Sequence, residues 1–369
     1  MKVLHVITGL AAGGAEQQLR ALLPYMNARC EVAVLTGLGV MAEAIRKAGV
    51  PVHQLDMHGN RDVRAVGRLA RLMRAGRYEV VHAHLYRACV YGRLAARLAN
   101  VPAIVATEHS IGYERIEGRR ITMAIRQLYL ASELLGHTTV AVSRAVADRL
   151  VAWGIPRSRI VVIANGIDGA AFGYDPRLRQ RTRAALGLPM DAFVVGGVGR
   201  LEHGKRFDLL IEAMKSAGDA EDPRMVLLLV GAGSLRRRLE ALARAIGVER
   251  RVIFTGESAD MRGMLSAMDV LAAPSEEETF GLAAVEALAA GLPVLYGTCP
   301  AIDDLPRDAA PGARRVTQGE LGAEIRALAA ARPARLAPPG AVRLYDIRHQ
   351  VDQLEALYRR LLGATANKE

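Results

Sequence analysis

The chain has 369 residues, of which 51% are apolar and 24% charged, so it can bury more than one core, and wholesale disorder is excluded. Its three widely spaced cysteines, Cys30, Cys89 and Cys299, exclude a disulfide scaffold and a Cys-rich zinc site, and they fit a reducing compartment. No apolar run approaches the roughly 20 residues of a membrane span, and the apolar run at the start is too short for a secretion signal. We therefore expect a cytoplasmic protein of two or three domains.

The formal net charge of +11 is unevenly distributed. Residues 1–172 contain 22 Lys and Arg against 12 Asp and Glu, whereas residues 173–369 contain 27 against 26. Nearly all of the positive surplus therefore lies in the first half, and it bears on what that half binds.

In the first half, short β-branched runs alternate with longer amphipathic segments. The runs are continuous and bounded by turn residues, which predicts strands buried on both faces of a parallel sheet; they are residues 3–7, 32–35, 80–84, 104–107, 139–142 and 160–163. Helices are predicted by apolar residues at three- and four-residue spacing in segments 15–23, 41–48, 63–75 and 89–98. This order predicts a doubly wound α/β domain.

The same pattern restarts in the second half, after the turn signal Asn165-Gly166-Ile167-Asp168 and a predicted helix at 177–186. Strands are predicted at residues 194–197, 226–230, 252–255, 270–273 and 293–296, and helices at 207–217, 235–246, 259–267 and 282–290. A Pro- and Ala-rich loop at 333–340 and an amphipathic helix at 351–362 close the chain. We expect Rossmann-like domains at 1–170 and 171–345, with residues 346–369 as a final helix. Ligands of such sheets bind at the carboxyl ends of the strands, so we expect the site in a cleft between the domains.

Each half of the chain has a glycine-containing loop directly after its first predicted strand. Gly13 and Gly14 lie in Gly-Leu-Ala-Ala-Gly-Gly-Ala-Glu, where glycine lets the backbone approach a ligand and the next helix offers free N–H groups to an anion. The glycine spacing differs from the dinucleotide fingerprint, and a tight turn without a ligand explains this loop equally well. In the second half, Gly199-Arg200 and Lys205 place two fixed cations at a strand's carboxyl end, which suits a diphosphate; a solvated basic loop is the alternative. Gly231 offers further backbone N–H groups, or belongs to a plain helix cap.

The most specific motif is Pro-Ser-Glu-Glu-Glu-Thr-Phe-Gly-Leu at 274–282, followed by Glu286. If the segment were wholly helical, eight residues from Glu278 to Glu286 would span about 12 Å, which is comparable with the separation of the two sugars of a nucleotide sugar. A solvated helix start accounts for Glu276 and Glu277 but poorly for Glu286, which falls among alanines and leucines.

Taken in order, these motifs, together with Thr107-Glu108-His109, resemble glycosyltransferase family 4 over roughly residues 1–362. The resemblance implies a GT-B fold and a retaining, metal-independent enzyme that moves a sugar from a nucleoside-diphosphate sugar of UDP or GDP type to a hydroxyl acceptor. It implies that Arg200 and Lys205 bind the diphosphate, Glu286 the ribose, and Glu278 and His109 the donor sugar beside the reaction centre. It also implies a donor site lined by further residues: Gly13, Gly14, Gly199, Gly231, Phe254, Gly256, Phe280, Gly281 and Leu282. The resemblance further implies that residues 1–170 bind the acceptor, that residues 171–345 bind the nucleotide sugar, and that the final helix at 346–369 crosses back onto the first domain. No cofactor is expected.

Three positions depart from the family pattern. Thr279 stands where Gly is usual, Ala164 replaces a Pro, and Thr-Cys-Pro-Ala-Ile-Asp-Asp at 298–304 replaces Gly-Gly-x-x-Glu. Because of the departures at Thr279 and at residues 298–304, the sequence does not predict which sugar the donor carries.

Other residues carry weaker signals. His82 and His84 alternate along a predicted strand, and with no third ligand apparent we interpret them as strand-end histidines rather than a metal site. No Asp-x-Asp is available to hold a metal–diphosphate complex.

The sequence leaves two classes of acceptor: a lipid-linked or cell-envelope glycan, and a small natural product. Arg64, Arg68 and Arg71 share one face of a predicted helix, and three further arginines, Arg115, Arg119 and Arg120, cluster in a predicted loop. Such a basic face predicts peripheral contact with an anionic membrane at the inner face of the plasma membrane, or is simply solvated. Two other functions remain open: a nucleotide-sugar epimerase of the same fold, and a basic nucleic-acid-binding protein, for which recognition motifs and aromatic platforms are lacking.

Overall fold

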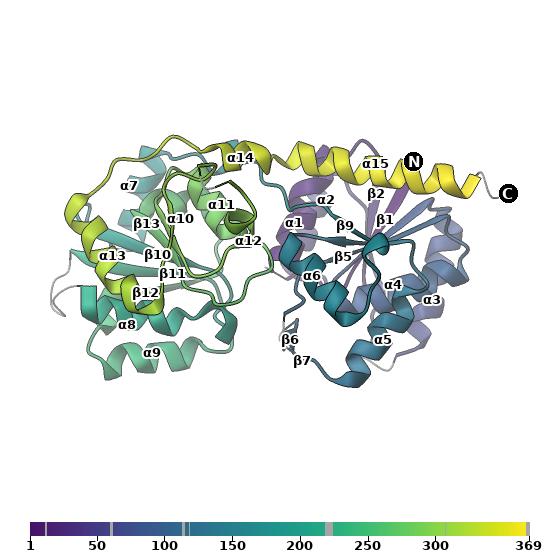
Figure 1. The fold of residues 1–369 in the computed structure, drawn as a ribbon, viewed down its shortest axis with the longest axis horizontal. Coiled ribbons are helices and arrows are strands. Elements are labelled where there is room, and N and C mark those ends of the chain that lie inside the picture. Colours follow the sequence, from purple (N-terminus) through teal and green to yellow (C-terminus); the bar gives the residue numbers. More distant parts are fainter. Residues whose placement is uncertain are drawn as a thin grey trace. The chain divides into compact units, whose positions relative to one another are not determined.

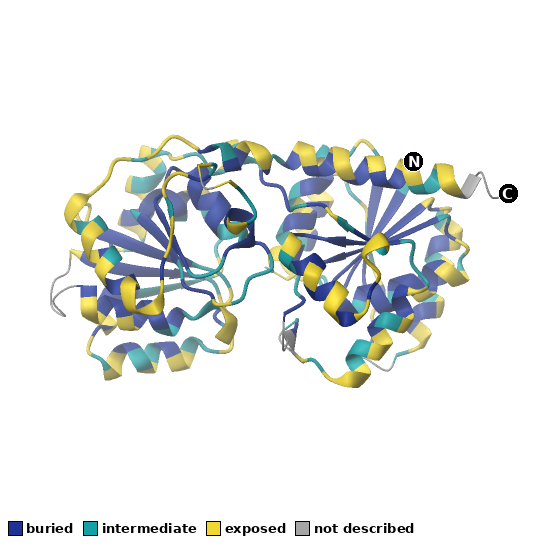
Figure 2. Cartoon of the chain, viewed as in Figure 1, coloured by how far each residue is buried: buried dark blue, intermediate teal, exposed yellow. Residues whose placement is uncertain are grey.

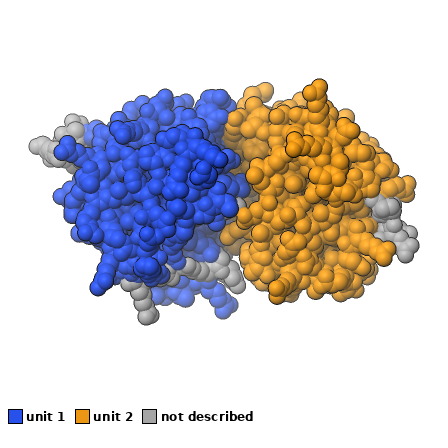
Figure 3. Space-filling model, turned by 180° about the vertical axis from the view of Figure 1, so that it is seen from behind, with its two compact units in different colours: residues 1–166, 345–369 blue, residues 167–344 orange. Residues whose placement is uncertain are grey.

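The computed structural model describes residues 1–11, 13–59, 62–112, 115–117, 119–217, 224–306 and 308–366. The chain divides into two compact units, each an α/β domain (Figures 1 and 3). Unit 1 comprises residues 1–166 and 345–369, and unit 2 comprises residues 167–344.

Unit 1 is built on a seven-stranded parallel sheet in the order β3-β2-β1-β4-β5-β8-β9. The strands are β1 (Lys2–Ile7), β2 (Arg29–Val34), β3 (Val52–Gln54), β4 (Val80–His84), β5 (Ala103–Glu108), β8 (Thr138–Ala141) and β9 (Ile160–Val162). The helices are α1 (Gly14–Leu22), α2 (Met41–Lys47), α3 (Arg64–Gly76), α4 (Tyr86–Leu98), α5 (Met123–Glu133), α6 (Arg144–Trp153) and α15 (Ile347–Ala366). Strands β1, β4 and β5 are buried almost throughout, which their β-branched sequences suit because helices cover both faces (Figure 2).

The last helix, α15, belongs to the core of unit 1. Ile347, Val351, Leu354, Leu357 and Tyr358 pack with the apolar residues of α1, α2 and the sheet (Figure 1). Glu355 of the same helix accepts hydrogen bonds from the backbone N–H groups of Asn27 (2.7 Å) and Ala28 (2.9 Å). The sequence predicted this helix over 351–362, and it extends further in both directions.

Unit 2 is built on a six-stranded parallel sheet in the order β12-β11-β10-β13-β14-β15. The strands are β10 (Phe193–Val198), β11 (Met225–Val230), β12 (Val252–Gly256), β13 (Val270–Ala273), β14 (Val294–Tyr296) and β15 (Ala313–Arg315). The helices are α7 (Pro176–Ala185), α8 (Phe207–Ala217), α9 (Arg236–Ala245), α10 (Met261–Ala267), α11 (Leu282–Ala289), α12 (Pro300–Asp303), α13 (Gln318–Ala331) and α14 (Gly340–Leu344). The two parallel sheets confirm the predicted pair of Rossmann-like domains.

Capping residues fix several helix starts. Asp175 accepts from the N–H of Arg177 (2.8 Å) just before Pro176 opens α7, and Asp260 accepts from Gly263 N (2.8 Å), so α10 begins at Met261 rather than at the predicted 259. The serine at 143 caps α6 by accepting from Val146 N (3.2 Å). The basic segment expected as a loop is instead a two-stranded antiparallel hairpin, β6 (Arg115–Ile116) and β7 (Arg119–Arg120).

Candidate functional site

The carboxyl ends of three neighbouring strands of unit 2 meet at a row of glycines. Gly199 follows β10, Gly231 follows β11 and Gly256 ends β12; the Gly231 N–H donates to the Gly256 carbonyl (2.8 Å), and the Gly199 N–H to that of Val230 (3.0 Å). A Cβ on Gly231 would lie 2.0 Å from the Gly199 carbonyl oxygen, and its φ of +142° also requires glycine. Gly231 is therefore closely packed, and the N–H groups of Gly199 and Gly231 donate within this edge rather than to a ligand, contrary to the expectation for Gly231.

Lys205 lies beside this edge, at the end of a short 3-10 turn (His203–Lys205). Its Nζ forms an ion pair with the Glu278 carboxylate, and the two side chains are 28% and 15% exposed. The Lys205 aliphatic chain runs past Gly199, where an added Cβ would come within 3.0 Å of Cε. The structure thus brings together two predicted site residues, one expected to bind the diphosphate and the other the donor sugar.

Glu278 is held in the loop between β13 and α11. The buried Ser275 hydroxyl donates to its Oε1 (3.2 Å), and Gly281, with φ of +104°, turns the chain into α11. A Cβ on Gly281 would lie 2.4 Å from the Cys299 Sγ, so the loop packs closely on the β14–α12 connection. A cavity of about 20 Å³ lies here, lined by Val198, Lys205, Phe207, Ala273, Ser275, Glu278, Gly281, Ala283, Ala284, Thr298 and Cys299.

The other predicted residues of unit 2 have different environments. Arg200 is exposed, and its charge adds to the hydrogen bond from Ser234 N that lowers the pKa of Glu202. Glu286 is buried within α11 (8% exposed) and therefore does not behave as a solvated glutamate. Phe254 is half-buried, with the Arg236 guanidinium 5.6 Å from its ring centroid. Two more predicted residues lie at the start of α11: Phe280, which is buried, and Leu282, which is half-buried.

In unit 1, the glycine loop leads into α1. Gly13 is the N-cap of this helix, and a Cβ there would lie 2.3 Å from the Glu16 carboxylate; Gly14 is exposed. Ala12 of this loop lies outside the described residues. The loop lies at the carboxyl end of β1, where such sheets bind ligands, and the Glu16 carboxylate lies close to the N-cap Gly13.

His109 directly follows β5 and belongs to a cluster of four histidines. Its Nε2 lies 3.2 Å from Nδ1 of His84, whose Nε2 lies 3.0 Å from Nδ1 of His5. His82 stacks beside His84 with ring centroids 4.2 Å apart and hydrogen-bonds the Tyr358 hydroxyl (2.6 Å). The expectation that His82 and His84 have no third imidazole nearby is wrong, because His5, on the adjacent strand β1, completes a group whose ligand atoms lie within 4.8 Å of one another.

Burial keeps this cluster uncharged. Desolvation lowers the pKa of His5 to about 3 and that of His109 to about 4, and burial also lowers the pKa of His82 and of His84. On the opposite face of β5, desolvation followed by the charge of Glu117 raises the pKa of the buried Glu108 carboxyl to about 7.

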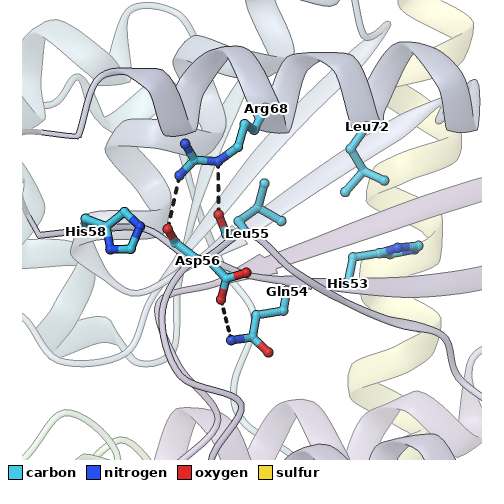
Figure 4. Close-up of a pocket in the computed structure, with 7 residues that line it drawn as sticks. All are labelled: His53, Gln54, Leu55, Asp56, His58, Arg68 and Leu72. Carbon is cyan, nitrogen blue, oxygen red and sulfur yellow. Dashed lines mark hydrogen bonds between the residues drawn. The ribbon is translucent and has the colours of Figure 1, made fainter.

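A separate hollow of about 500 Å³ lies in unit 1 beyond the end of β3, lined by His53, Gln54, Leu55, Asp56, His58, Arg68 and Leu72 (Figure 4). The Arg68 guanidinium donates to the Leu55 carbonyl (3.0 Å) and the Asp56 carbonyl (3.2 Å), and it pairs with Asp62 (2.8 Å). Of the three arginines predicted to form a basic face on α3, only Arg64 and Arg71 are exposed, because Arg68 is occupied in this way.

Sequence reasoning missed the contacts that organise these residues. The Lys205–Glu278 pair and the His5–His84–His109 hydrogen bonds join residues from different strand ends, and the strand register that aligns them has no local sequence signal. The alternating His-x-His of β4 was the available hint.

Comparisons with known proteins identify the family of this chain. Residues 12–170 match the family model "Glycosyltransferase Family 4", and residues 179–318 match "Glycosyl transferases group 1". A D-inositol 3-phosphate glycosyltransferase of Catenulispora acidiphila is 32% identical over 319 residues, covering 79% of this chain and 74% of the relative. An Escherichia coli UDP-Gal:alpha-D-GlcNAc-diphosphoundecaprenol alpha-1,3-galactosyltransferase is 28% identical over 69% of this chain and 66% of its own length. Several of the curated relatives are matched over only 55–66% of their length.

Solved structures share the fold along the whole chain. The crystal structure of Anabaena HepE in complex with UDP and glucose superposes with a TM-score of 0.85 at 22% identity, covering 98% of this chain and all of that one.

Proposed function

This chain belongs to glycosyltransferase family 4 and has the GT-B fold, and from that membership we propose that it transfers a sugar from a nucleoside-diphosphate sugar to a hydroxyl acceptor. The observation that carries the proposal is the pairing of Lys205 with Glu278 beside the glycine edge of unit 2. A phosphate-binding cation and a sugar-binding carboxylate in contact are what a donor with a diphosphate next to its sugar requires.

The donor diphosphate is proposed to bind between Lys205 and Arg200, beside the strand end at Gly199. The Lys205 ammonium exchanges its Glu278 partner for phosphate oxygens, and the exposed Arg200 adds a bidentate donor. Glu278, released from Lys205, accepts hydrogen bonds from sugar hydroxyls. Glu286 binds the ribose, and Phe254 and Gly256 line the pocket for the nucleotide base.

In the reaction, the bond between the anomeric carbon and the diphosphate oxygen breaks, and the acceptor oxygen forms the new bond to that carbon. The acceptor's proton passes to the departing diphosphate. Catalysis consists of stabilising the leaving diphosphate with fixed cations and aligning the acceptor hydroxyl, and Lys205 and Arg200 serve the first task without a metal. We propose retention of configuration, with attack on the face that the diphosphate leaves.

The donor base is proposed as uridine, with guanosine as the alternative. The Escherichia coli relative is named for UDP-Gal, and the Anabaena structure was determined with UDP. The donor sugar depends on the 298–304 segment, where Asp303 accepts from the Tyr296 hydroxyl (3.2 Å) and from Cys299 N (3.0 Å).

The acceptor is proposed to be lipid-linked, with unit 1 resting on an anionic membrane. In helix α5, Met123 (67%) and Leu128 (52%) are exposed, as is the C-cap residue Leu134 (69%); the neighbouring helix α4 exposes Leu98 (51%). The exposed Arg97 and Arg120 belong to the same unit and supply positive charge. No helix within the described residues is both long and apolar enough to cross a bilayer.

A thermal-shift screen of nucleotide sugars tests the proposed function. Binding of one UDP- or GDP-sugar is expected to raise the melting temperature, and the same compound should leave the K205A variant unchanged. The donor so identified is then supplied with undecaprenyl-diphosphate-linked and soluble hydroxyl acceptors, and the product is identified by mass spectrometry. Failure of every nucleotide sugar to stabilise the protein would refute the proposal.

A further inference from the structure

Two ion pairs connect the same two loops at the carboxyl edge of the unit 2 sheet. The loop after β10 carries Lys205 and Arg206. The loop after the neighbouring strand β13 carries Glu276 and Glu278. The inner pair joins Lys205 to Glu278, and the outer pair joins Arg206 to Glu276. The pair that contains two residues of the proposed donor site therefore has a neighbour of the same chemistry that contains none.

The inner pair is better shielded from water than the outer pair. Its two side chains are 28% and 15% exposed, and both line the small cavity of unit 2. In the outer pair, the Glu276 side chain is 69% exposed, and the Arg206 guanidinium also lies 3.3 Å from the Asp208 carboxylate. Because charges attract each other more strongly where water is excluded, opening the inner pair costs more than opening the outer pair.

In this structure, the two members of the inner pair are held in contact. The Lys205 chain packs against Gly199, and the Ser275 hydroxyl donates to Glu278 Oε1 (3.2 Å). A ligand that binds only one member must open the pair, and its apparent dissociation constant rises because only the open fraction of the protein can bind it. A ligand that supplies an anion and hydroxyl groups together replaces both partners in one binding event.

We propose that the inner pair couples the two ends of the donor, so that the diphosphate and the sugar each bind more tightly when the other is present. A nucleoside diphosphate alone then binds more weakly than one that still carries its sugar. After transfer, Glu278 loses its sugar ligand and competes with the product diphosphate for Lys205, which favours product release. This inference rests on the proposed function for the identity of the two ligands, and it adds the coupling between them.

The first test uses inorganic pyrophosphate and titration calorimetry of the full chain, and it needs no sugar. Glu278→Gln keeps the size of the side chain and removes its charge, so this variant should bind pyrophosphate about three- to tenfold more tightly than the wild type. The same change in a Lys205→Gln background should bring no gain, because the pair is already absent there. Glu276→Gln removes the same charge from the same loop, and it should leave the affinity within about twofold of the wild type.

Two results of this test would overturn the proposal. One is a Glu278→Gln variant that binds pyrophosphate no more tightly than the wild type. The other is a gain that persists without Lys205, because the gain would then come from relief of charge repulsion between the carboxylate and the anion.

The second test uses UDP, or GDP if the thermal-shift screen selects it, together with the free sugar of the donor so identified. The free sugar should tighten nucleotide binding by about threefold or more, and the nucleotide should tighten sugar binding by the same factor. Nucleotide affinity that is unchanged by the sugar would overturn the coupling. If no nucleotide sugar stabilises the protein, the proposed function fails, while the pyrophosphate titrations still decide whether the inner pair competes with an anion for Lys205.

Discussion

Lys205 and Glu278 are 73 positions apart in the sequence, yet their side chains form an ion pair at the carboxyl edge of the unit 2 sheet. The pair is only partly exposed, so each charge depends on the other or on a ligand of suitable charge. A diphosphate next to a sugar offers both replacements at once.

Replacing Lys205 by Ala is therefore expected to lower kcat/KM at least tenfold, because the leaving diphosphate loses a fixed positive charge. Steady-state kinetics with the identified donor measures the loss. Lys215→Ala, at an exposed position in the last turn of α8, is the matched control and should retain the wild-type rate. If the Lys205→Ala variant turned over at the wild-type rate, the assignment of Lys205 to the diphosphate site would be refuted.

Gly231→Ala is expected to destabilise unit 2 by about 1–3 kcal/mol, because its Cβ would collide with the Gly199 carbonyl oxygen at a positive φ. Urea unfolding measures the change. Gly204→Ala, in the same edge region with nothing within 4 Å of the added Cβ, should change stability by less than about 0.5 kcal/mol. Equal effects of the two changes would show that the glycine edge is not closely packed.

Glu108→Gln is expected to stabilise the protein at high pH only. The raised pKa of Glu108, about 7 against 4.5 in the unfolded chain, means that the wild type loses stability as pH rises between these values. The neutral amide avoids this loss, so the variant should gain on the order of 3 kcal/mol above pH 7 and almost nothing below pH 4.5. Chemical unfolding across this range is the measurement, and a pH-independent difference would contradict the burial argument.

The histidine cluster should make the fold acid-sensitive. His5 and His109 have pKa values lowered to about 3 and about 4 from 6.5, so the stability they contribute is present above pH 6.5 and is lost as pH falls toward those values. Each of these two histidines adds about 1.4 kcal/mol per pH unit to the slope of the free energy of unfolding against pH. The Glu108 carboxyl contributes a slope of the opposite sign, and the two histidines together outweigh it. Phe in place of His5 should reduce the slope, whereas Asn in place of the exposed His58 should not.

Flotation with vesicles tests the α5 surface. The wild type should float with phosphatidylglycerol-containing vesicles and not with neutral ones, and Leu128→Glu combined with Leu134→Glu should abolish association while leaving transfer to a soluble acceptor unchanged. The matched change Val40→Glu, at an exposed apolar position outside α5, should leave flotation intact. Wild-type protein that stays with the soluble fraction at low salt would favour a soluble acceptor.

Sequence patterns predicted the long buried strands because continuous β-branched runs such as Val80–His84 occur in strands covered on both faces. They missed β3 and β15, three residues each, because an edge strand needs little apolar sequence. The family motifs predicted Lys205 and Glu278 as site residues, and the structure shows that the two side chains are in contact. The contact between those two residues, and the third histidine at position 5, depend on strand order and register, which only the folded chain reveals.

The packing of α15 has a consequence for how the protein is made. Unit 2 is one continuous stretch of chain, whereas the core of unit 1 includes Leu354, Leu357 and Tyr358. All of unit 2 is synthesised before α15, so residues 1–166 expose the apolar groove that this helix fills until α15 has emerged. The half synthesised first is thus completed last, and a chaperone would have most reason to protect that groove in the interval.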